Sequence, residues 1–268
     1  MQLRQELTRW HYAPGQKPVA SGPRRIRPEF SVWRGESLPA ERKDAMLILD
    51  WMKPNVITVM PDTSLLQCKK LLKDNRINYL PVVDRDKIVV GLISSSDLKT
   101  FAPQHATGYE ILEALDMMAE TKVKDVMVVA PVVINYNNTV EQAAKVMFDR
   151  HVACLPVIDD EDKLVGIITG WDVFHALLNM SGAEQGGEEA GFLLPNQPGT
   201  IREILDTLKT NGMSVISVLS AAADNGMRQV KIRFRAQDAS ALDGTFEILQ
   251  KHNGLRYWVR DGKVHMKG

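Results

Sequence analysis

The chain has 268 residues, of which 44% are apolar, and 33 basic residues balance 33 acidic ones to give zero net charge. This length suggests about two domains, and a neutral chain has no global field that would recruit nucleic acid or an anionic membrane. Its longest apolar stretches, such as residues 126–134, fall far short of the ~20 residues of a membrane-spanning helix. The polar N-terminus shows no signal-peptide pattern, so we expect a cytoplasmic protein.

Residues 1–45 form a region of their own. They hold five of the 13 prolines, carry nine basic against five acidic residues and show no sustained helical or strand period. We predict a disordered Pro/Arg-rich tail. The alternative is a nucleic-acid-binding arm, because a basic cluster at residues 24–27 lies near Trp10 and Trp33, and such side chains bind phosphates and bases. Met46 opens directly into the next segment and is a second candidate start of the protein.

Short apolar runs separated by turns begin at residue 46 and return 75 residues later. The first copy predicts a strand at residues 56–59, a helix at 65–75, strands at 79–83 and 88–93, a helix from 94 to 99 and a spacer helix at 109–120. The second predicts a strand at residues 132–134, a helix at 140–150, strands at 154–158 and 164–168, and a helix at 171–180. Aligned without gaps, residues 50–97 and 125–172 share 13 identical positions. We therefore predict one β-α-β-β-α unit used twice, at 46–120 and 121–180, with each copy covering the other's apolar face.

A different unit follows an acidic, glycine-rich stretch. We predict a flexible linker at residues 181–190, with Glu188 and Glu189 as a solvated charge pair. Beyond it the pattern predicts a strand at residues 192–194, a helix at 200–211, strands at 213–219 and 228–234 around the hairpin signal Asp224-Asn225-Gly226, a helix at 239–252 and a strand at 255–259. This βαββαβ order is the ferredoxin-like arrangement, predicted for residues 191–268. The whole chain is then of the α/β (α+β) class.

The sequence shows no catalytic constellation. Its six histidines are scattered without metal-site spacing, and it has no P-loop, no Gly-x-Gly-x-x-Gly and no Gly-x-Ser-x-Gly motif. Cys68 and Cys154 are isolated, which supports neither a disulfide framework nor a metal site, and we expect both in the core. We therefore predict a protein that is not an enzyme and needs no metal or cofactor.

Each repeat ends in one signature, Gly91-x-x-Ser94-x-x-Asp97 in the first copy and Gly166-x-x-Thr169-x-x-Asp172 in the second. Two such copies place a hydroxyl and a carboxylate on each side of a pseudo-two-fold cleft, which indicates a ligand receptor. The structural alternative is that each Asp only caps the helix that follows, which stabilises the helix without any ligand.

On these residues the two repeats resemble a pair of CBS domains, the tandem known as a Bateman module. Residues 190–259 resemble an ACT domain, whose sequence sign is the Pro-Gly turn before the first helix, here Pro198-Gly199. A CBS pair followed by an ACT domain, with an opening such as residues 46–52, is similar to the bacterial AcuB-type acetoin-utilization proteins. The resemblance covers residues 46–259.

The resemblance to CBS pairs implies an adenosine-containing ligand such as AMP, ATP or S-adenosylmethionine. Asp97 or Asp172 would accept hydrogen bonds from the two hydroxyls of the ribose, and Ser94 or Thr169 would meet a phosphate at a helix N-terminus. The adenine wall would be built by Val56, Ile57, Thr58, Val132, Val133 and Ile134. Trp171 would either stack on a ring or belong to the core or to a dimer surface.

The sequence departs from the phosphate-gripping CBS pairs, many of which carry His or Arg two or three residues before the Pro of Leu-Pro-Val. Asn78 and Tyr79 occupy these positions in the first copy, and Ala153 and Cys154 occupy them in the second. Charge-assisted contacts to phosphate are strong, and they are missing at these places. We therefore expect adenosine, AMP or S-adenosylmethionine rather than a triphosphate.

The resemblance to ACT domains implies an amino-acid effector at the loop before the first helix of that unit. Asn196 and the backbone N–H groups after Gly199 would take its carboxylate. The chain has Gly212-Met-Ser214 where the family often has Gly-x-Asn. The alternative is a domain that only dimerises.

We therefore predict a regulatory protein that senses an adenosine-type ligand and relays the signal to the ACT domain or to a partner protein. The ligand must bind two arrangements of the module with different affinity, since otherwise it shifts nothing. Because both domain types usually self-associate, we expect a homodimer. The alternatives are a transcriptional regulator that binds nucleic acid through the basic tail, and a structural adaptor with degenerate clefts.

Overall fold

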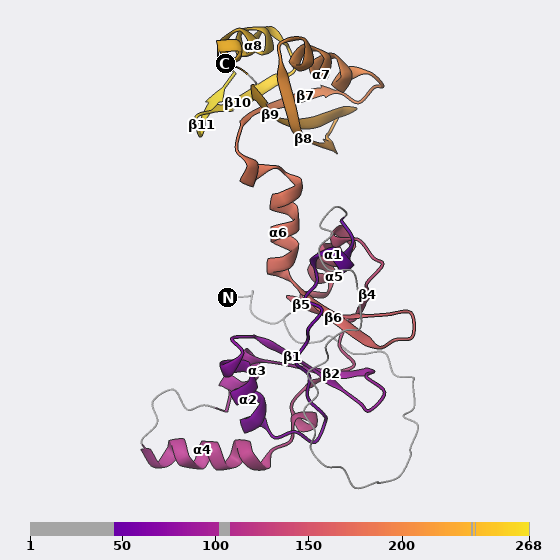
Figure 1. Ribbon diagram of the computed structural model, residues 1–268, viewed down its shortest axis with the longest axis vertical. Coiled ribbons are helices and arrows are strands. Elements are labelled where there is room, and N and C mark those ends of the chain that lie inside the picture. The colour runs from indigo at the N-terminus through magenta and orange to yellow at the C-terminus, as the bar shows by residue number, and fades with distance from the viewer. Residues whose placement is uncertain (1–45, 102–107, 237, 239, 268) are drawn as a thin grey trace, which may run out of the picture. The chain divides into compact units, whose positions relative to one another are not determined.

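The computed structural model describes residues 46–101, 108–236, 238 and 240–267 of the chain (Figure 1). The predicted tail at residues 1–45, with its alternative as a nucleic-acid-binding arm, lies outside the described residues. Within the described ranges, the chain is of mixed α/β class, and none of its helices is long and apolar enough to cross a membrane.

The first repeat combines a three-stranded antiparallel sheet with helices. In chain order its elements are α1 (Ile48–Trp51), α2 (Leu65–Asp74), β1 (Tyr79–Val83), β2 (Val89–Ser94), α3 (Ser95–Lys99) and α4 (Gly108–Glu120). The opening segment of the second repeat forms the 3-10 turn η1 (Val123–Asp125) and supplies the third strand of this sheet, β3 (Val128–Val129). The sheet order is β1-β2-β3. The strand predicted at residues 56–59 is present as an isolated bridge, in which Val59 pairs in parallel with Val82 of β1.

The second repeat reproduces the first. After η1 and β3, its elements are β4 (Ile134–Asn135), α5 (Val140–Arg150), β5 (Cys154–Ile158), β6 (Leu164–Thr169) and α6 (Gly170–Met180). Strand β4 runs parallel to β5, and β5 runs antiparallel to β6. The register also repeats, because Leu80 pairs with Ile93 and Leu155 pairs with Ile168. The gap-free repeat of the sequence is therefore a repeat of the backbone.

The opening segment of each repeat packs into the core of the other repeat. Ile48, Trp51 and Met52 lie in the apolar cluster built by α5, β5, β6 and α6. Val123 and Met127, which open the second copy, lie in or against the cluster built by α2, β1 and β2. Neither repeat therefore has a complete core without the first residues of the other.

Two methionines of the exchanged segments contact glycines of the opposite repeat. A Cβ atom at Gly166 would lie well inside van der Waals contact of the Sδ atom of Met52. A Cβ atom at Gly91 would collide in the same way with Sδ of Met127. Since close-packed interiors leave no room for such an extra atom, each methionine requires a glycine at this point of the opposite repeat. Packing thus explains the glycine of the signature.

A third apolar cluster joins the two repeats. It contains Val56, Val83, Cys154, Leu164 and Ile167. A backbone bridge between Lys53 and Ile167 accompanies it. The core positions predicted for the two cysteines are confirmed, with Cys154 in this cluster and Cys68 in the core of the first repeat. The two repeats therefore form one packed pair.

The C-terminal unit is a five-stranded antiparallel sheet with two helices on one face (Figure 1). Its elements are β7 (Glu188–Pro195), α7 (Thr200–Thr210), β8 (Met213–Ala222), β9 (Met227–Ala236), α8 (Ser240–Lys251), β10 (Leu255–Arg260) and β11 (Lys263–Met266). The sheet order is β11-β10-β7-β9-β8. Apolar side chains of α7 and α8 pack with alternate residues of β7 and β9. The predicted β-α-β-β-α-β order is present, and β11 adds a strand beyond it.

Two hairpin turns of this unit use residues in the left-handed region. Asn225 and Gly226 have φ values of 57° and 69°, as the Asn-Gly signal between β8 and β9 predicts. Asp261 and Gly262 have φ values of 48° and 72° between β10 and β11. This Asp-Gly pair is a signal of the same kind, and it would have predicted the strand β11 that the sequence patterns above left out.

Residues 181–190, which were predicted to form a flexible linker, contain regular secondary structure. It holds a 3-10 turn, η2 (Ala183–Gln185), and β7 begins at Glu188, so its last residues belong to the sheet. The prediction of a solvated charge pair is wrong for Glu189, which is only 7% exposed. Strand β7 runs between β10 and β9, and side chains of both neighbours cover it.

We expect Gly166→Ala to destabilise the chain by about 1–3 kcal/mol, because the new methyl group collides with Met52. Met52→Ala should cost about 2–5 kcal/mol, since it opens a cavity at a buried site. In the double variant the two costs should not add, because the small side chain at position 52 makes room for the methyl group. Urea unfolding of the four proteins measures this coupling.

The matched control combines Gly91→Ala with Met52→Ala, because Gly91 contacts Met127 instead. The two costs should add there to within about 0.5 kcal/mol. Coupling of Met52 to Gly91 rather than to Gly166 would refute the exchanged packing.

Candidate functional site

The signature residues of the first repeat form a helix cap. The N–H and the hydroxyl of Ser94 both donate to Oδ2 of Asp97, at 2.7 and 2.8 Å. The N–H of Asp97 donates to Oγ of Ser94 at 3.3 Å, which completes a reciprocal capping box at the start of α3. The bonds that Asp97 accepts from Ser94 use Oδ2, so its Oδ1 atom is left for another partner.

The signature of the second repeat forms the same cap. The N–H and the hydroxyl of Thr169 donate to Oδ2 of Asp172 at 2.8 and 2.5 Å. The helix that begins here, α6, has 11 residues, whereas α3 has five, so the helix dipole is larger at the second signature. The helix-capping alternative is thus present in both copies, and ligand contacts of these side chains remain a prediction.

Lys53 distinguishes the two signatures. Its Nζ atom lies 3.8 Å from Oδ1 of Asp172, and the lysine side chain is 66% exposed while that of Asp172 is 14% exposed. Lys53 reaches this place because the opening segment of the first repeat crosses to β6, where it bridges Ile167. The residue 75 positions later is Val128, so the first signature has no matching lysine. Lys53 was not predicted from the sequence, because only the exchanged packing brings it to Asp172.

Tyr79 and Cys154 occupy equivalent positions beside the two signatures. Tyr79 pairs with Ser94 in the sheet, and Cys154 pairs with Thr169. Burial raises the pKa of Tyr79, and the nearby Cys154 and Asp97 raise it further. Burial raises the pKa of Cys154 to about 12, which leaves a protonated thiol without nucleophilic character. Both signatures therefore adjoin groups that stay uncharged at neutral pH.

The six residues predicted to wall an adenine differ in burial. Val56, Thr58 and Ile134 are buried, whereas Ile57, Val132 and Val133 are half-buried. Val56 shares an apolar cluster with Cys154, whose strand neighbour is Thr169, whereas Ile57 packs against the core of the first repeat. The structure thus brings Lys53 of the first repeat to Asp172 of the second, and Val56 to Cys154, the strand neighbour of Thr169.

Two pockets are open on the described surface, and one of them borders the first signature, because Ser95 and Leu98 line it. One of about 390 Å³ is on the first repeat between α2 and α3, and one of about 640 Å³ is on the C-terminal sheet. Neither is lined by Ser94, Asp97, Thr169 or Asp172, so the cleft expected between the signatures remains a prediction. No group of three His, Cys, Asp or Glu side chains within the described residues could hold a metal ion.

The residues predicted to bind an amino acid lie at the start of α7. Gly199 is the N-cap of that helix with a φ of 93°, and the N–H of Asn196 donates to the carbonyl of Gly226 at 2.8 Å. Asn196 and Gly199 are both exposed. This arrangement explains the turn, and an effector bound there remains a prediction.

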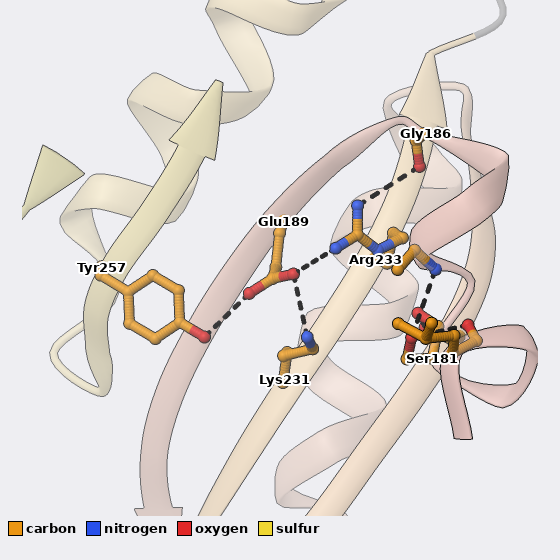
Figure 2. A network of polar contacts seen from close by, with 9 residues as sticks. Ser181, Gly186, Glu189, Lys231, Arg233 and Tyr257 are labelled. Carbon is orange, nitrogen blue, oxygen red and sulfur yellow. Dashed lines mark hydrogen bonds and ion pairs between the residues drawn. The ribbon is translucent and has the colours of Figure 1, made fainter. Parts of the chain in front are cut away.

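A network of polar contacts surrounds the buried Glu189 in the C-terminal sheet (Figure 2). Oε2 of Glu189 accepts from Arg233 at 2.6 Å and lies 3.1 Å from Nζ of Lys231. Oε1 accepts from the hydroxyl of Tyr257 at 2.9 Å. Arg233 also donates to the carbonyl of Gly186 at 3.4 Å, so the network ties the segment before β7 to the sheet. Basic residues alternate along β9, and this alternation is a sequence signal that could have indicated an acidic partner such as Glu189 on a neighbouring strand.

The network makes stability depend on pH in the alkaline range. Burial, and then the hydrogen bond to Glu189, raise the pKa of Tyr257 from 10.0 to about 12. Between these values the unfolded chain releases the phenolic proton while the folded chain keeps it, so the free energy of unfolding falls as the pH rises. In Tyr257→Phe we expect a smaller fall between pH 10 and 12, measured by urea unfolding. The two cysteine thiols affect the pH dependence of the wild type and of the variant alike. Identical slopes of the free energy of unfolding against pH in the two proteins would disprove the assignment to Tyr257.

The two repeats match the CBS domain family at residues 48–103 and 123–179, and the match ends before the C-terminal unit. Uncharacterized protein MJ1426 of Methanocaldococcus jannaschii is 32% identical over 157 residues, which cover 50% of this chain and 93% of that protein. The solved structure of CBSX2 from Arabidopsis thaliana in complex with AMP has 30% identity and a TM-score of 0.42, covering 50% of this chain and 97% of its own. A candidate acetoin utilization protein (AcuB) from Vibrio cholerae has 26% identity and a TM-score of 0.42, covering 52% of this chain and 96% of its own.

Proposed function

The chain belongs to the CBS-domain family, and we propose that its CBS pair senses an adenosine-type ligand instead of catalysing a reaction. The observation that carries the proposal is the position of Asp172, whose Oδ2 caps α6 while its Oδ1 lies near the exposed Lys53. A carboxylate held by its own helix is ready to accept the hydroxyls of a ribose. A cation beside it can pair with a phosphate. AMP carries both groups and is the ligand we favour.

The second signature suits this ligand better than the first. Its helix is longer, and Lys53 has only Val128 as its counterpart at the first signature. An exposed ammonium group loses little hydration when it turns from Asp172 toward a phosphate. Val56 packs in the cluster that contains Cys154, and we propose that it would support the apolar wall for a base. A single cation favours one phosphate over three.

We propose that α6 carries the signal toward the C-terminal unit. Asp172 lies in the first turn of this helix, and the carbonyl of Ser181, just beyond its last turn, accepts from the hydroxyl of Ser217 on β8 at 2.8 Å. The carbonyl of Gly186 accepts from Arg233 on β9. A ligand that binds Asp172 would shift the start of a helix whose other end is bonded to the sheet.

We infer that the C-terminal unit is an ACT domain and that the whole is a regulator of the AcuB type. The strand order β10-β7-β9-β8 with two helices on one face supports this assignment, as does the Pro198-Gly199 turn before α7. The ligand-bound CBS pair would then act on a partner protein through this unit.

AMP should raise the melting temperature of the full chain, because a ligand at 100 times its Kd adds about 2.7 kcal/mol of stability. In Asp172→Ala the AMP-induced shift should disappear. This variant also loses a helix cap worth about 1 kcal/mol, so the readout is the shift and not the melting temperature of the free protein. Asp97→Ala is the matched control, since it loses the same kind of cap and should keep the shift.

Lys53→Met belongs to the same experiment and separates the phosphate from the nucleoside. Calorimetric titration should show AMP binding about tenfold more weakly, as expected for one lost charge-assisted contact of ~1.5 kcal/mol, with adenosine binding unchanged. An equal loss for both ligands would reject the role of Lys53. No response of the wild-type chain to AMP, adenosine, ATP or S-adenosylmethionine would reject the sensor and favour the structural adaptor.

Hydrogen exchange tests the relay. In the wild-type chain AMP should change the exchange of amides in β8 as well as at the start of α6. Ser217→Ala removes the bond to Ser181, so AMP should still bind and still protect α6 while the change in β8 disappears. Ser214→Ala, which alters an exposed serine of the same strand, should behave like the wild type. A response in β8 that survives Ser217→Ala would argue against this route.

A further inference from the structure

The face of the C-terminal sheet that points away from the two helices carries a pocket. Phe192 and its alternate neighbours in β7 pack with α7 and α8, and because side chains alternate along a strand, Gly191 and Leu193 belong to the other face. A pocket of about 640 Å³ opens there and crosses β10, β7, β9 and β8. This volume is within the range of small-molecule sites.

Apolar groups form most of the pocket. Leu193 of β7 and Leu219 of β8 line it, and so does Tyr257 of β10. A Cβ atom at Gly191 would collide with the ring of Tyr257, so the glycine gives the ring its place against the middle strand of the sheet. An aromatic ring and two branched side chains suit the apolar body of an organic ligand better than a bare inorganic ion.

Two cations line the same pocket. The side chain of Lys231 is 32% exposed, and its Nζ atom lies 3.1 Å from Oε2 of Glu189, an oxygen that also accepts from Arg233 at 2.6 Å (Figure 2). Arg256 is exposed, and its guanidinium group has no hydrogen-bond or ion-pair partner within the described ranges. One carboxylate thus offsets only one of three positive charges, so the pocket attracts an anion.

The pocket offers no acceptor for an ammonium group. No Asp or Glu within the described ranges lines it. Glu189 contacts two of the lining residues, but it is only 7% exposed and both of its oxygens are already paired (Figure 2). An α-amino acid would therefore bring an ammonium group that loses hydration without gaining a partner, which opposes binding. A carboxylic acid without an amino group avoids this loss.

We infer that this pocket binds a small carboxylic acid that has an apolar or aromatic body and no amino group. Its carboxylate would lie between Arg256 and Lys231, and its body would pack on the ring of Tyr257. Lys231 can turn toward the ligand because Glu189 keeps its bonds to Arg233 and Tyr257. The inference goes beyond the proposed function, because it concerns a separate site and requires no adenosine-type ligand.

A pair of probes that differ by one ammonium group tests the selectivity. Calorimetric titration of the full chain should show 3-phenylpropanoate binding at least about tenfold more tightly than L-phenylalanine, as expected for one charged group left without a partner. Equal affinities would overturn the inferred ligand class. No binding of 3-phenylpropanoate at millimolar concentration would overturn the site itself, and this is also the result expected if a second copy of the chain covers the sheet face.

Arg256→Met tests the position of the carboxylate. Because Arg256 is exposed and unpaired within the described part of the chain, the variant should keep its fold, and 3-phenylpropanoate should bind about tenfold more weakly. Arg202→Met is the matched control, since it removes an exposed arginine from α7, on the opposite face of the sheet. It should bind the probe like the wild type. An unchanged affinity in Arg256→Met would contradict the site.

Leu219→Glu supplies the acceptor that the pocket lacks. The new carboxylate should repel that of 3-phenylpropanoate and pair with the ammonium group of L-phenylalanine, so the preference for the acid should disappear. A preference that survives would place the probe elsewhere on the chain and refute the inference. AMP belongs to the second signature in the proposed function, so its stabilising effect should persist in all three variants, and a failure of either proposal is seen separately.

Discussion

Each repeat depends on the first residues of the other, and the rest of the CBS pair follows from this exchange. Met52 packs on Gly166 and Met127 packs on Gly91, so the glycine that opens each signature is a packing residue. Trp51 is buried in the opposite repeat as well. Burial of a large apolar side chain stabilises the folded state by about 1.5–3 kcal/mol. A repeat folded alone would lose this contribution for every side chain that the other repeat supplies to its core. The sequence shows two units, but each unit needs residues of the other to complete its core.

The exchange also makes the candidate site composite and the two signatures unequal. Lys53 follows Met52 directly, so anchoring the methionine on Gly166 delivers the lysine to Asp172. The caps formed by the signatures are alike, and the difference comes from the neighbour that the other repeat supplies. A duplicated unit can therefore keep its backbone and its caps while only one copy gains a cation.

Features that depend on residues near each other in the sequence could be predicted, and features that depend on distant contacts could not. The element order of both repeats, the cap at Ser94 and the turn at Asn225 are local, and the patterns showed them. Lys53 and Glu189 owe their positions to partners in other elements. Glu189 follows a glycine-rich acidic stretch that looks like a loop, and only the pairing of β7 with β9 and β10 reveals a strand. The run at residues 56–59 likewise has the β-branched residues of a strand, but it forms only an isolated bridge.

The ordered structure of residues 181–190 gives the proposed relay a physical basis. A flexible segment at residues 181–190 would absorb a movement of α6 in its own conformational freedom. Instead, Arg233 is bonded to both Gly186 and Glu189, and a Cβ atom at Gly187 would lie 2.6 Å from the carbonyl oxygen of Phe234, so the segment lies tight against the sheet. A buried carboxylate is tolerated only while its partners are present. The Glu189 network thus stiffens the connection, and without it the CBS pair could bind its ligand while the C-terminal unit failed to respond.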